Sequence, residues 1–273
     1  MTRIADVLGR RGRKAYYAAL HRDIGDAFNR AYVGDDARIE GDTQTAYLLA
    51  LAFDLLAEEL RPRAAERLVA DIERHDWHLT TGFVGVGLLC PVLTEFGYAD
   101  VAHRLLVNES FPSWGYSIRH GATTIWERWD GWTEQHGFQT AMMNSFNHYS
   151  LGSVAQWLYE YVAGIRTDPG RPGYEHVVIG PTPGQLERAE ATFESVRGSI
   201  RSAWRRTAER FELTVEVPAN VTATVILPVA GELREGTVDA AAAPGVHEAR
   251  RENGRWVAEV GSGTYDFSVA AHS

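Results

Sequence analysis

The sequence predicts an α+β chain of two domains, a partial double ring of helices followed by an antiparallel β-sandwich. In the first part, apolar residues recur at helical spacing, and helices that are apolar all round alternate with helices that are apolar on one face. After a Pro- and Gly-rich stretch at 168–173, the apolar period falls from about 3.6 residues to about 2, which is typical of half-buried strands. We therefore expect domains at residues 1–167 and 174–273, with 168–173 as their linker.

Two helices are expected at the N-terminus. Residues 1–9 are expected to end one helix, with Ile4, Val7 and Leu8 on its apolar side. A second helix is expected over 14–32, where the apolar residues share one face: Tyr17, Leu20, Ile24, Ala27, Phe28 and Ala31. Their spacing is that of an amphipathic helix.

The next four helices predict the double ring. Residues 45–60 and 84–96 are apolar nearly all round, so both segments are expected to be buried on every side. The helices that follow them are apolar on one face only, at Ala65, Leu68, Val69 and Ile72 and then at Val101, Ala102, Leu105 and Leu106. Buried helices then form an inner ring and one-faced helices an outer ring, which is the pattern of an α/α toroid.

A glycine- and tryptophan-rich loop at 113–137 and a last helix over 147–163 complete this domain. Asn147 is a candidate cap of that helix, which places His148 in its first turn, at the mouth of the ring. The segments supply fewer helices than a closed (α/α)6 toroid requires, so the toroid is expected to be partial.

Short alternating segments predict the second domain. Apolar and polar residues alternate over 211–217, 221–227, 256–260 and 265–269, and Pro218 and Asn220 mark a turn between the first two segments. Several short strands joined by regular turns are typical of an antiparallel sandwich.

Composition excludes some classes of function. The net charge of −9 argues against a nucleic-acid surface and favours a neutral ligand. The single cysteine, Cys90, excludes an internal disulfide, and its apolar surroundings predict a buried, inert thiol. Residues 1–14 lack the apolar core of a signal peptide, and no stretch has the length and apolar character of a membrane span. A cytoplasmic location is therefore expected.

One segment stands out as a candidate site. Residues 126–132 (WERWDGW) contain three tryptophans and two carboxylates in seven positions. Tryptophan stacks on the apolar face of a sugar ring, and a carboxylate among aromatic rings suits acid–base chemistry. The segment is either a sugar-binding loop or a rigid aromatic plug over the edge of the core.

Two weaker candidates lie elsewhere in the chain. His75 and His78 are three residues apart, but no third and fourth ligand follow with a recognisable spacing, so no metal site is expected. Asp42 and Gln44 precede a buried helix and point either into the ring or toward the backbone, and a helix cap is the expected role of Asp42 or Thr43.

The candidate loop also carries a family resemblance. Residues 122–129 (ATTIWERW) resemble the general-base motif of the bacterial α-L-rhamnosidases, glycoside hydrolase family seventy-eight, and residues 144–150 (NSFNHYS) resemble its second motif. His148 follows Glu127 by 21 positions, which matches the family spacing. Residues 42–47 and 79–83 resemble further family segments less specifically.

The resemblance implies an inverting hydrolase of terminal α-L-rhamnosides that needs no cofactor. Glu127 is then the general base, favoured in its ionised form by Arg119 or Arg128, and His148 contacts the rhamnose. Trp126 and Trp129 are expected to stack on the sugar, Asp130 to make a polar contact, and Phe83 to line the site or the core.

The chain departs from the family in length. The segment that carries the family's general acid, upstream of the base, has no counterpart in these residues, so the chain is expected to be an inactive fragment when isolated. The alternative is a non-catalytic carbohydrate-binding or scaffold protein derived from the fold. The open side of a partial toroid is expected to bind a second copy of the chain or a missing N-terminal half.

Overall fold

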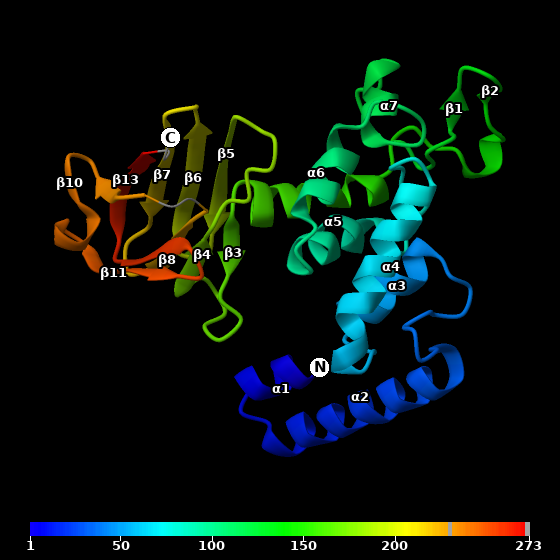
Figure 1. Cartoon of the computed structure of the whole chain (residues 1–273), viewed down its shortest axis with the longest axis horizontal. Coiled ribbons are helices and arrows are strands. Elements are labelled where there is room, and N and C mark those ends of the chain that lie inside the picture. Colours follow the sequence, from blue (N-terminus) through cyan, green and yellow to red (C-terminus); the bar gives the residue numbers. More distant parts are fainter. Residues whose placement is uncertain (229–230, 271–273) are drawn as a thin grey trace. The chain divides into compact units, whose positions relative to one another are not determined.

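The computed structural model of the protein describes residues 1–228 and 231–270. The chain divides into two compact units, Met1–Val154 and Ala155–Ser273 (Figure 1). The domain limits expected from the sequence, 1–167 and 174–273, stay a prediction, and residues 271–273 lie outside the described part.

Helices dominate the first unit. Its α-helices are α1 (Thr2–Val7), α2 (Arg11–Tyr32), α3 (Gln44–Ala52), α4 (Arg61–Arg74), α5 (Val86–Glu95), α6 (Ala99–Val107) and α7 (Trp114–Arg119), with α8 (Val154–Trp157) at the boundary. Shorter elements are the 3-10 helices η1 (Glu58–Leu60), η2 (Ala141–Met143) and η3 (Ser150–Ser153), and the hairpin strands β1 (Trp132–Thr133) and β2 (Gly137–Phe138).

The packing of α3 to α6 confirms the expected inner and outer layers. Helix α3 packs on α5, α4 packs on α3, and α6 packs on α5. Leu48 of α3 and Leu89 of α5 are fully buried, whereas α4 and α6 are buried on one side and polar on the other. The arrangement is part of an α/α toroid, and its driving force is the burial of the apolar inner helices.

Several helix limits differ from the expectation. Helix α3 ends at Ala52 rather than Leu60, because Asp54 adopts the left-handed conformation (φ 53°) that terminates helices. The helix expected over 147–163 is absent at its start: His148 lies in a loop because its backbone N–H donates to Ile125 O (2.8 Å). Helical structure begins at η3 and continues through α8 into the π-helix η4 (Leu158–Val162).

The N-terminal helices form, but they are largely exposed. Ile4 and Leu8, on the expected apolar side of the first helix, are 56% and 64% exposed. Helix α2 spans 22 residues, and Gly25 is its only buried residue. The two expected helices are therefore present, and much of the apolar side of each is exposed to solvent.

The second unit contains two sheets. The six-stranded sheet has the order β10 (Val238–Asp239), β9 (Leu233–Glu235), β13 (Gly263–Ala270), β7 (Arg210–Val217), β6 (Gly198–Arg206), β5 (Arg188–Ser195). The five-stranded sheet has the order β11 (Val246–Glu252), β12 (Arg255–Val260), β8 (Thr222–Leu227), β4 (His176–Ile179), β3 (Ile165–Thr167). One further element is the 3-10 helix η5 (Ala240–Ala242).

The alternating residues of these strands form the core, as expected. Phe211, Leu213 and Val215 of β7 are buried, and so are Val225 and Leu227 of β8. Among the described strands, one pair departs from the antiparallel rule, since β4 and β8 run parallel. The chain between them passes through β5, β6 and β7 of the other sheet, and this long connection permits a parallel return.

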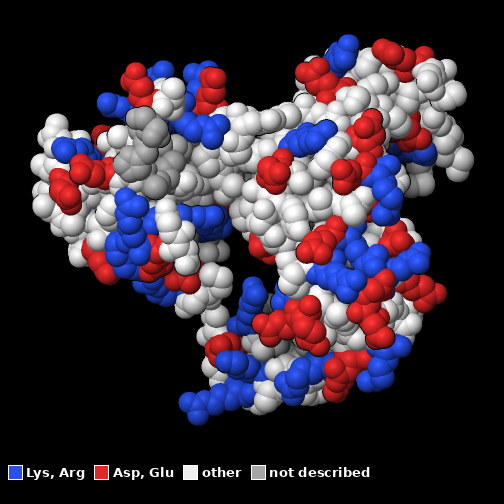
Figure 2. Space-filling model, in the orientation of Figure 1, with Lys and Arg blue, Asp and Glu red and all other residues white. Residues whose placement is uncertain are grey.

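Charged side chains are distributed over the surface. Figure 2 shows acidic and basic groups intermixed, so neither sign dominates the face in view. Within residues 1–228 and 231–270, no helix combines the length and apolar character needed to cross a membrane.

Candidate functional site

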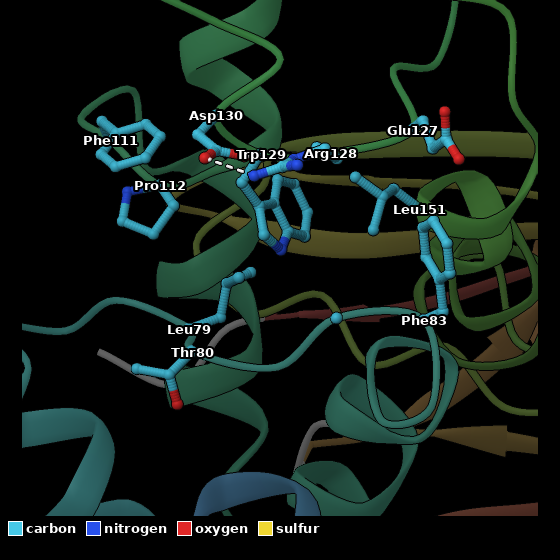
Figure 3. Close-up of a pocket in the computed structure, with 11 residues that line it drawn as sticks. Leu79, Thr80, Phe83, Phe111, Pro112, Glu127, Arg128, Trp129, Asp130 and Leu151 are labelled. Atoms are coloured by element: carbon cyan, nitrogen blue, oxygen red, sulfur yellow. Dashed lines mark hydrogen bonds and ion pairs between the residues drawn. The ribbon is translucent and has the colours of Figure 1, made fainter. Parts of the chain in front are cut away.

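A cleft of about 440 Å³ in the first unit brings together segments that are distant in sequence (Figure 3). Its lining is Leu79, Thr80, Gly82, Phe83, Phe111, Pro112, Glu127, Arg128, Trp129, Asp130 and Leu151. In this view Phe111 and Pro112 lie toward one end, Glu127 and Phe83 toward the other, and Trp129 between them. Apolar and aromatic walls with a few charged groups are typical of a small-molecule site.

Trp129 is held in place by its neighbours. Its Nε1 donates to Thr81 O (2.9 Å), and its ring meets the Trp114 ring edge to face at 5.4 Å. Trp114 is buried and donates from Nε1 to Leu151 O (2.7 Å). The Trp129 ring is therefore a fixed flat surface in the cleft, which suits stacking on a sugar.

The backbone of the second motif, residues 144–150, holds the carboxylate of Glu127 in place. Its Oε2 accepts a hydrogen bond from Ser145 N (2.7 Å), and the Glu127 backbone N–H donates to Ser145 O (2.8 Å). A hydrogen bond to an ionised acceptor is stronger than a neutral one. Since a carboxylate accepts at about four positions, Glu127 retains capacity for a water molecule.

The Arg128 guanidinium forms its hydrogen bonds with Asp130. Its Nε and Nη2 donate to the two carboxylate oxygens of Asp130 at 2.8 and 2.9 Å. This pairing lowers the pKa of Asp130 below its usual range and raises the pKa of Arg128. Asp130 is therefore held as the anion, with its oxygens committed to the guanidinium.

His148 is in contact with Phe83, a lining residue of the cleft. Its ring stacks on Phe83 (centroids 4.9 Å apart) and on Tyr149 (5.4 Å), both at 7°. Its Nδ1 accepts from Ser150 N (3.3 Å), so the neutral ring carries its proton on Nε2 and offers one donor. His148 contacts a lining residue but is itself outside the lining.

Trp126 does not occupy the expected position. It is 8% exposed, packs edge to face on Phe146 at 5.1 Å, and is absent from the cleft lining. The chain around it is paired by backbone hydrogen bonds with residues 145–148, so neighbouring side chains point to opposite sides. Glu127 consequently faces the cleft and Trp126 the core, and the expected stacking of Trp126 on a sugar stays a prediction.

Comparison with known families decides the assignment of the chain. A family model described as the bacterial alpha-L-rhamnosidase six-hairpin glycosidase domain matches residues 1–162. The chain belongs to the bacterial α-L-rhamnosidase family. A second model, the bacterial alpha-L-rhamnosidase C-terminal domain, matches residues 164–241 of this rhamnosidase chain. The resemblance indicated by residues 122–129 and 144–150 is confirmed.

Individual relatives agree with this assignment. The α-L-rhamnosidase of Streptomyces avermitilis is 47% identical over 272 residues, which are 98% of this chain and 25% of the relative. An α-L-rhamnosidase of Formosa agariphila is 43% identical over 226 residues, which are 82% of this chain and 24% of the relative. The chain thus spans about a quarter of the length of the curated relatives it matches.

Solved structures give the same result. The crystal structure of the Streptomyces avermitilis α-L-rhamnosidase complexed with L-rhamnose aligns at a TM-score of 0.90 and 46% identity, over 98% of this chain and 25% of that chain. The α-L-rhamnosidase of Dictyoglumus thermophilum aligns at 0.87 and 33% identity, over 98% and 30%. The partial toroid followed by a sandwich is therefore a rhamnosidase architecture.

Of the residues expected in the rhamnosidase site, the cleft collects four: Phe83, Glu127, Trp129 and Asp130. Their expected contacts with rhamnose stay predictions. Sequence reasoning missed Phe111 and Pro112, although an aromatic–proline pair just before α7 was a usable signal. Leu79 belongs to the segment 79–83 that resembles a family segment, whereas Leu151 gave no signal, because an isolated leucine is equally typical of a core.

The weaker candidates have local structural roles. His75 Nδ1 lies 2.8 Å from Asp71 O, and His78 Nε2 lies 2.7 Å from Ser110 Oγ. Within the described ranges no three His, Cys, Asp or Glu side chains form a metal-binding group. Thr43 caps α3 by accepting from Ala46 N, and Asp42 accepts from the Tyr47 hydroxyl.

A contact between His120 and Glu134 holds the loop at residues 113–137, and the stability of this loop is therefore expected to depend on pH. His120 Nε2 lies 2.9 Å from Glu134 Oε1, and Nδ1 donates to Tyr116 O (2.7 Å). The Glu134 carboxylate raises the pKa of His120, and His120 lowers the pKa of Glu134. The stabilisation that protonated His120 gives to the loop is fully present below its ordinary pKa of about 6.5. It is lost as the pH rises through the raised pKa of the folded state.

The stabilisation that ionised Glu134 gives to the same loop is fully present above its ordinary pKa of about 4.3. It is lost as the pH falls through the lowered pKa of the folded state. Amide-exchange protection of the β1–β2 hairpin should therefore be greatest between about pH 4.3 and pH 6.5. His120→Gln should remove this maximum. Protection that is independent of pH in the parent chain contradicts the prediction.

Proposed function

We propose that this chain supplies the general-base side of a site that hydrolyses terminal α-L-rhamnosides with inversion. The observation that carries the proposal is the Glu127 carboxylate, which is held by Ser145 N–H at an aromatic-lined cleft. In an inverting glycosidase a carboxylate removes a proton from the attacking water while an acid about 6.5–9.5 Å away protonates the leaving oxygen. Glu127 takes the first role.

The cleft provides groups suited to a sugar. Trp129 and Phe83 offer apolar ring surfaces, and Asp130 offers carboxylate oxygens oriented by Arg128. His148 offers an Nε2–H donor at the edge of the Phe83 stack. The crystal structure of the Streptomyces avermitilis relative is a complex with L-rhamnose, which supports the same ligand class here.

The general acid must come from outside the cleft residues described. Glu127 and Asp130 are the two carboxylates of the lining, and Asp130 is held ionised by Arg128. Glu134, on the same loop, is held ionised by His120. A general acid must carry its proton near neutral pH, so neither carboxylate fits that role.

A chimera tests the proposed function. The matching C-terminal quarter of the Streptomyces avermitilis relative is exchanged for this chain, and release of nitrophenol from p-nitrophenyl α-L-rhamnoside is measured. We expect turnover with β-L-rhamnose as the first product. A folded chimera that binds L-rhamnose without hydrolysis supports the second candidate function instead, a non-catalytic sugar-binding protein. That candidate is favoured by the pairing of the Asp130 carboxylate with Arg128, which lowers the Asp130 pKa and makes Asp130 unsuited to donate a proton.

We further propose that the N-terminal helices dock on a second copy of this chain. Leu20 and Ile24 of α2 and Ile4 of α1 are 39%, 49% and 56% exposed. Burial of each such side chain stabilises an interface by about 1.5–3 kcal/mol. Sedimentation velocity of the isolated chain should show concentration-dependent association, weakened by Leu20→Glu with Ile24→Glu. A monodisperse monomer at high concentration contradicts the proposal.

A further inference from the structure

The second unit has a cleft of its own, of about 390 Å³. Its walls carry the aromatic rings of Tyr159, Tyr174 and Phe193, and polar groups of Gln156 and Glu160. Phe193 lies on β5 and Ile165 on β3, and each of these strands is the edge strand of its sheet. The cleft therefore joins the edges of both sheets to the helical segment that precedes them.

The helical wall of this cleft is firmly anchored. At the end of the π-helix η4, Val162 O accepts from the buried Trp204 Nε1 (2.7 Å), and Ala163 O accepts from the buried Ser202 Oγ (2.6 Å). Tyr159 and Glu160 belong to the same π-helix, a rare element that is frequent at functional sites. The sandwich thus holds these two side chains on a fixed support.

The opposite wall has an unusual backbone. Tyr174 adopts a φ of 58°, a conformation that is uncommon for a bulky residue. Its ring packs on Phe193 with centroids 5.0 Å apart at 33°. The cleft thus has a π-helix on one side and a left-handed residue on the other. Such rare backbone geometry clusters at ligand sites, which favours a binding role for this cleft.

The polar groups in the cleft form a pair. Gln156 Nε2 donates to Glu160 Oε1 (3.0 Å), which orients the carboxylate and leaves it acceptor capacity. Burial, followed by the charge of Glu160, raises the pKa of Tyr174, so its hydroxyl is a neutral donor. Aromatic faces beside an amide and a carboxylate match a ring with one apolar face and hydroxyl groups at its edge.

We propose that this cleft is a second carbohydrate site, which binds a neutral pyranose ring. Tyr159 and the Tyr174–Phe193 pair contact the apolar face of the ring, and Gln156 and Glu160 bind its hydroxyls. The carboxylate of Glu160 disfavours anionic ligands, so uronic acids bind more weakly than neutral sugars. The site is independent of Glu127 and of catalysis.

Titration of the whole chain with methyl α-L-rhamnoside tests the proposal. The protein carries Trp129→Ala to weaken the first cleft, and aromatic NMR signals of Tyr159, Tyr174 and Phe193 are followed. We expect these signals to shift, with a dissociation constant raised at least about fivefold by Tyr159→Ala or by Phe193→Leu. Phe193→Leu retains apolar volume and keeps the test valid if the alanine variant folds poorly.

Two controls set the specificity. Glu194→Gln, at an exposed neighbour of Phe193 on β5, should leave the dissociation constant within about twofold. Methyl β-D-glucuronide should bind more weakly than methyl β-D-glucoside, and Glu160→Gln should reduce that difference. No shift of the three signals with either neutral glycoside up to about 100 mM, or equal binding of the glucuronide by the parent protein, overturns the proposal.

Discussion

Glu127→Gln in the chimera is expected to lower kcat by about 10²–10⁴-fold, the usual value of general-base assistance. The amide oxygen of the glutamine can still accept from Ser145 N–H, so the shape of the loop is retained. The neutral amide cannot take a proton from water. The loss should therefore fall on kcat, with a smaller change in KM. The measurement is steady-state kinetics with p-nitrophenyl α-L-rhamnoside.

Glu134→Gln is the matched control for this substitution. Glu134 lies on the same loop and lines a different pocket of the first unit. It should change kcat by no more than about threefold, because it does not reach the attacking water. Near-normal kcat for Glu127→Gln removes Glu127 from the mechanism.

Gly164→Ala is expected to destabilise the second unit by about 2–5 kcal/mol, the sum of a left-handed conformation and of overpacking. Gly164 has a φ of 89°, and a Cβ there comes within 2.5 Å of the Gly180 carbonyl carbon. The obstacle is backbone, which cannot rotate away as a side chain can. It is also needed in place, since Gly180 N donates to Gly164 O (2.9 Å).

Gly173→Ala separates the two contributions. Gly173 has a similar φ of 83°, but an added Cβ has no atom within 4 Å. It should cost about 1–2 kcal/mol, the conformational part alone. Urea unfolding followed by the NMR signals of the buried Trp204 side chain in the second unit measures both variants. Equal destabilisation by the two substitutions contradicts the role of packing at Gly164.

The sequence predicted the layers because periodicity reports burial directly. Leu48 and Leu89 lie on helices that are apolar all round. Such helices must be covered on every side, which an inner layer provides. The period of 2 at Phe211–Val215 and at Val225–Leu227 likewise reports the inward faces of strands. The helix layers and the inward faces of the strands depend on the local spacing of apolar residues, which a single sequence contains.

Other features depend on distant partners. Helix α3 ends early at the left-handed residue Asp54, and the last helix begins late because His148 N–H donates to Ile125 O. Helix propensity alone could not locate either end. The pairing of two loops sets the orientation of Trp126, and the bond to Thr81 O sets that of Trp129. The Asp130 carboxylate is paired with Arg128. The type of chemistry was therefore predictable from residues 122–129, whereas the faces of the individual side chains were not.

The central claim is that this chain provides the base side of a rhamnosidase site without its acid. The most direct test is nitrophenol release from p-nitrophenyl α-L-rhamnoside by the isolated chain, compared with the chimera. We predict turnover at least about 10²-fold lower in the isolated chain, because an unprotonated alkoxide is a poor leaving group. Turnover of the isolated chain within about tenfold of the chimera, abolished by Glu127→Gln, contradicts the claim, since the acid is then present in this chain or in a second copy of it.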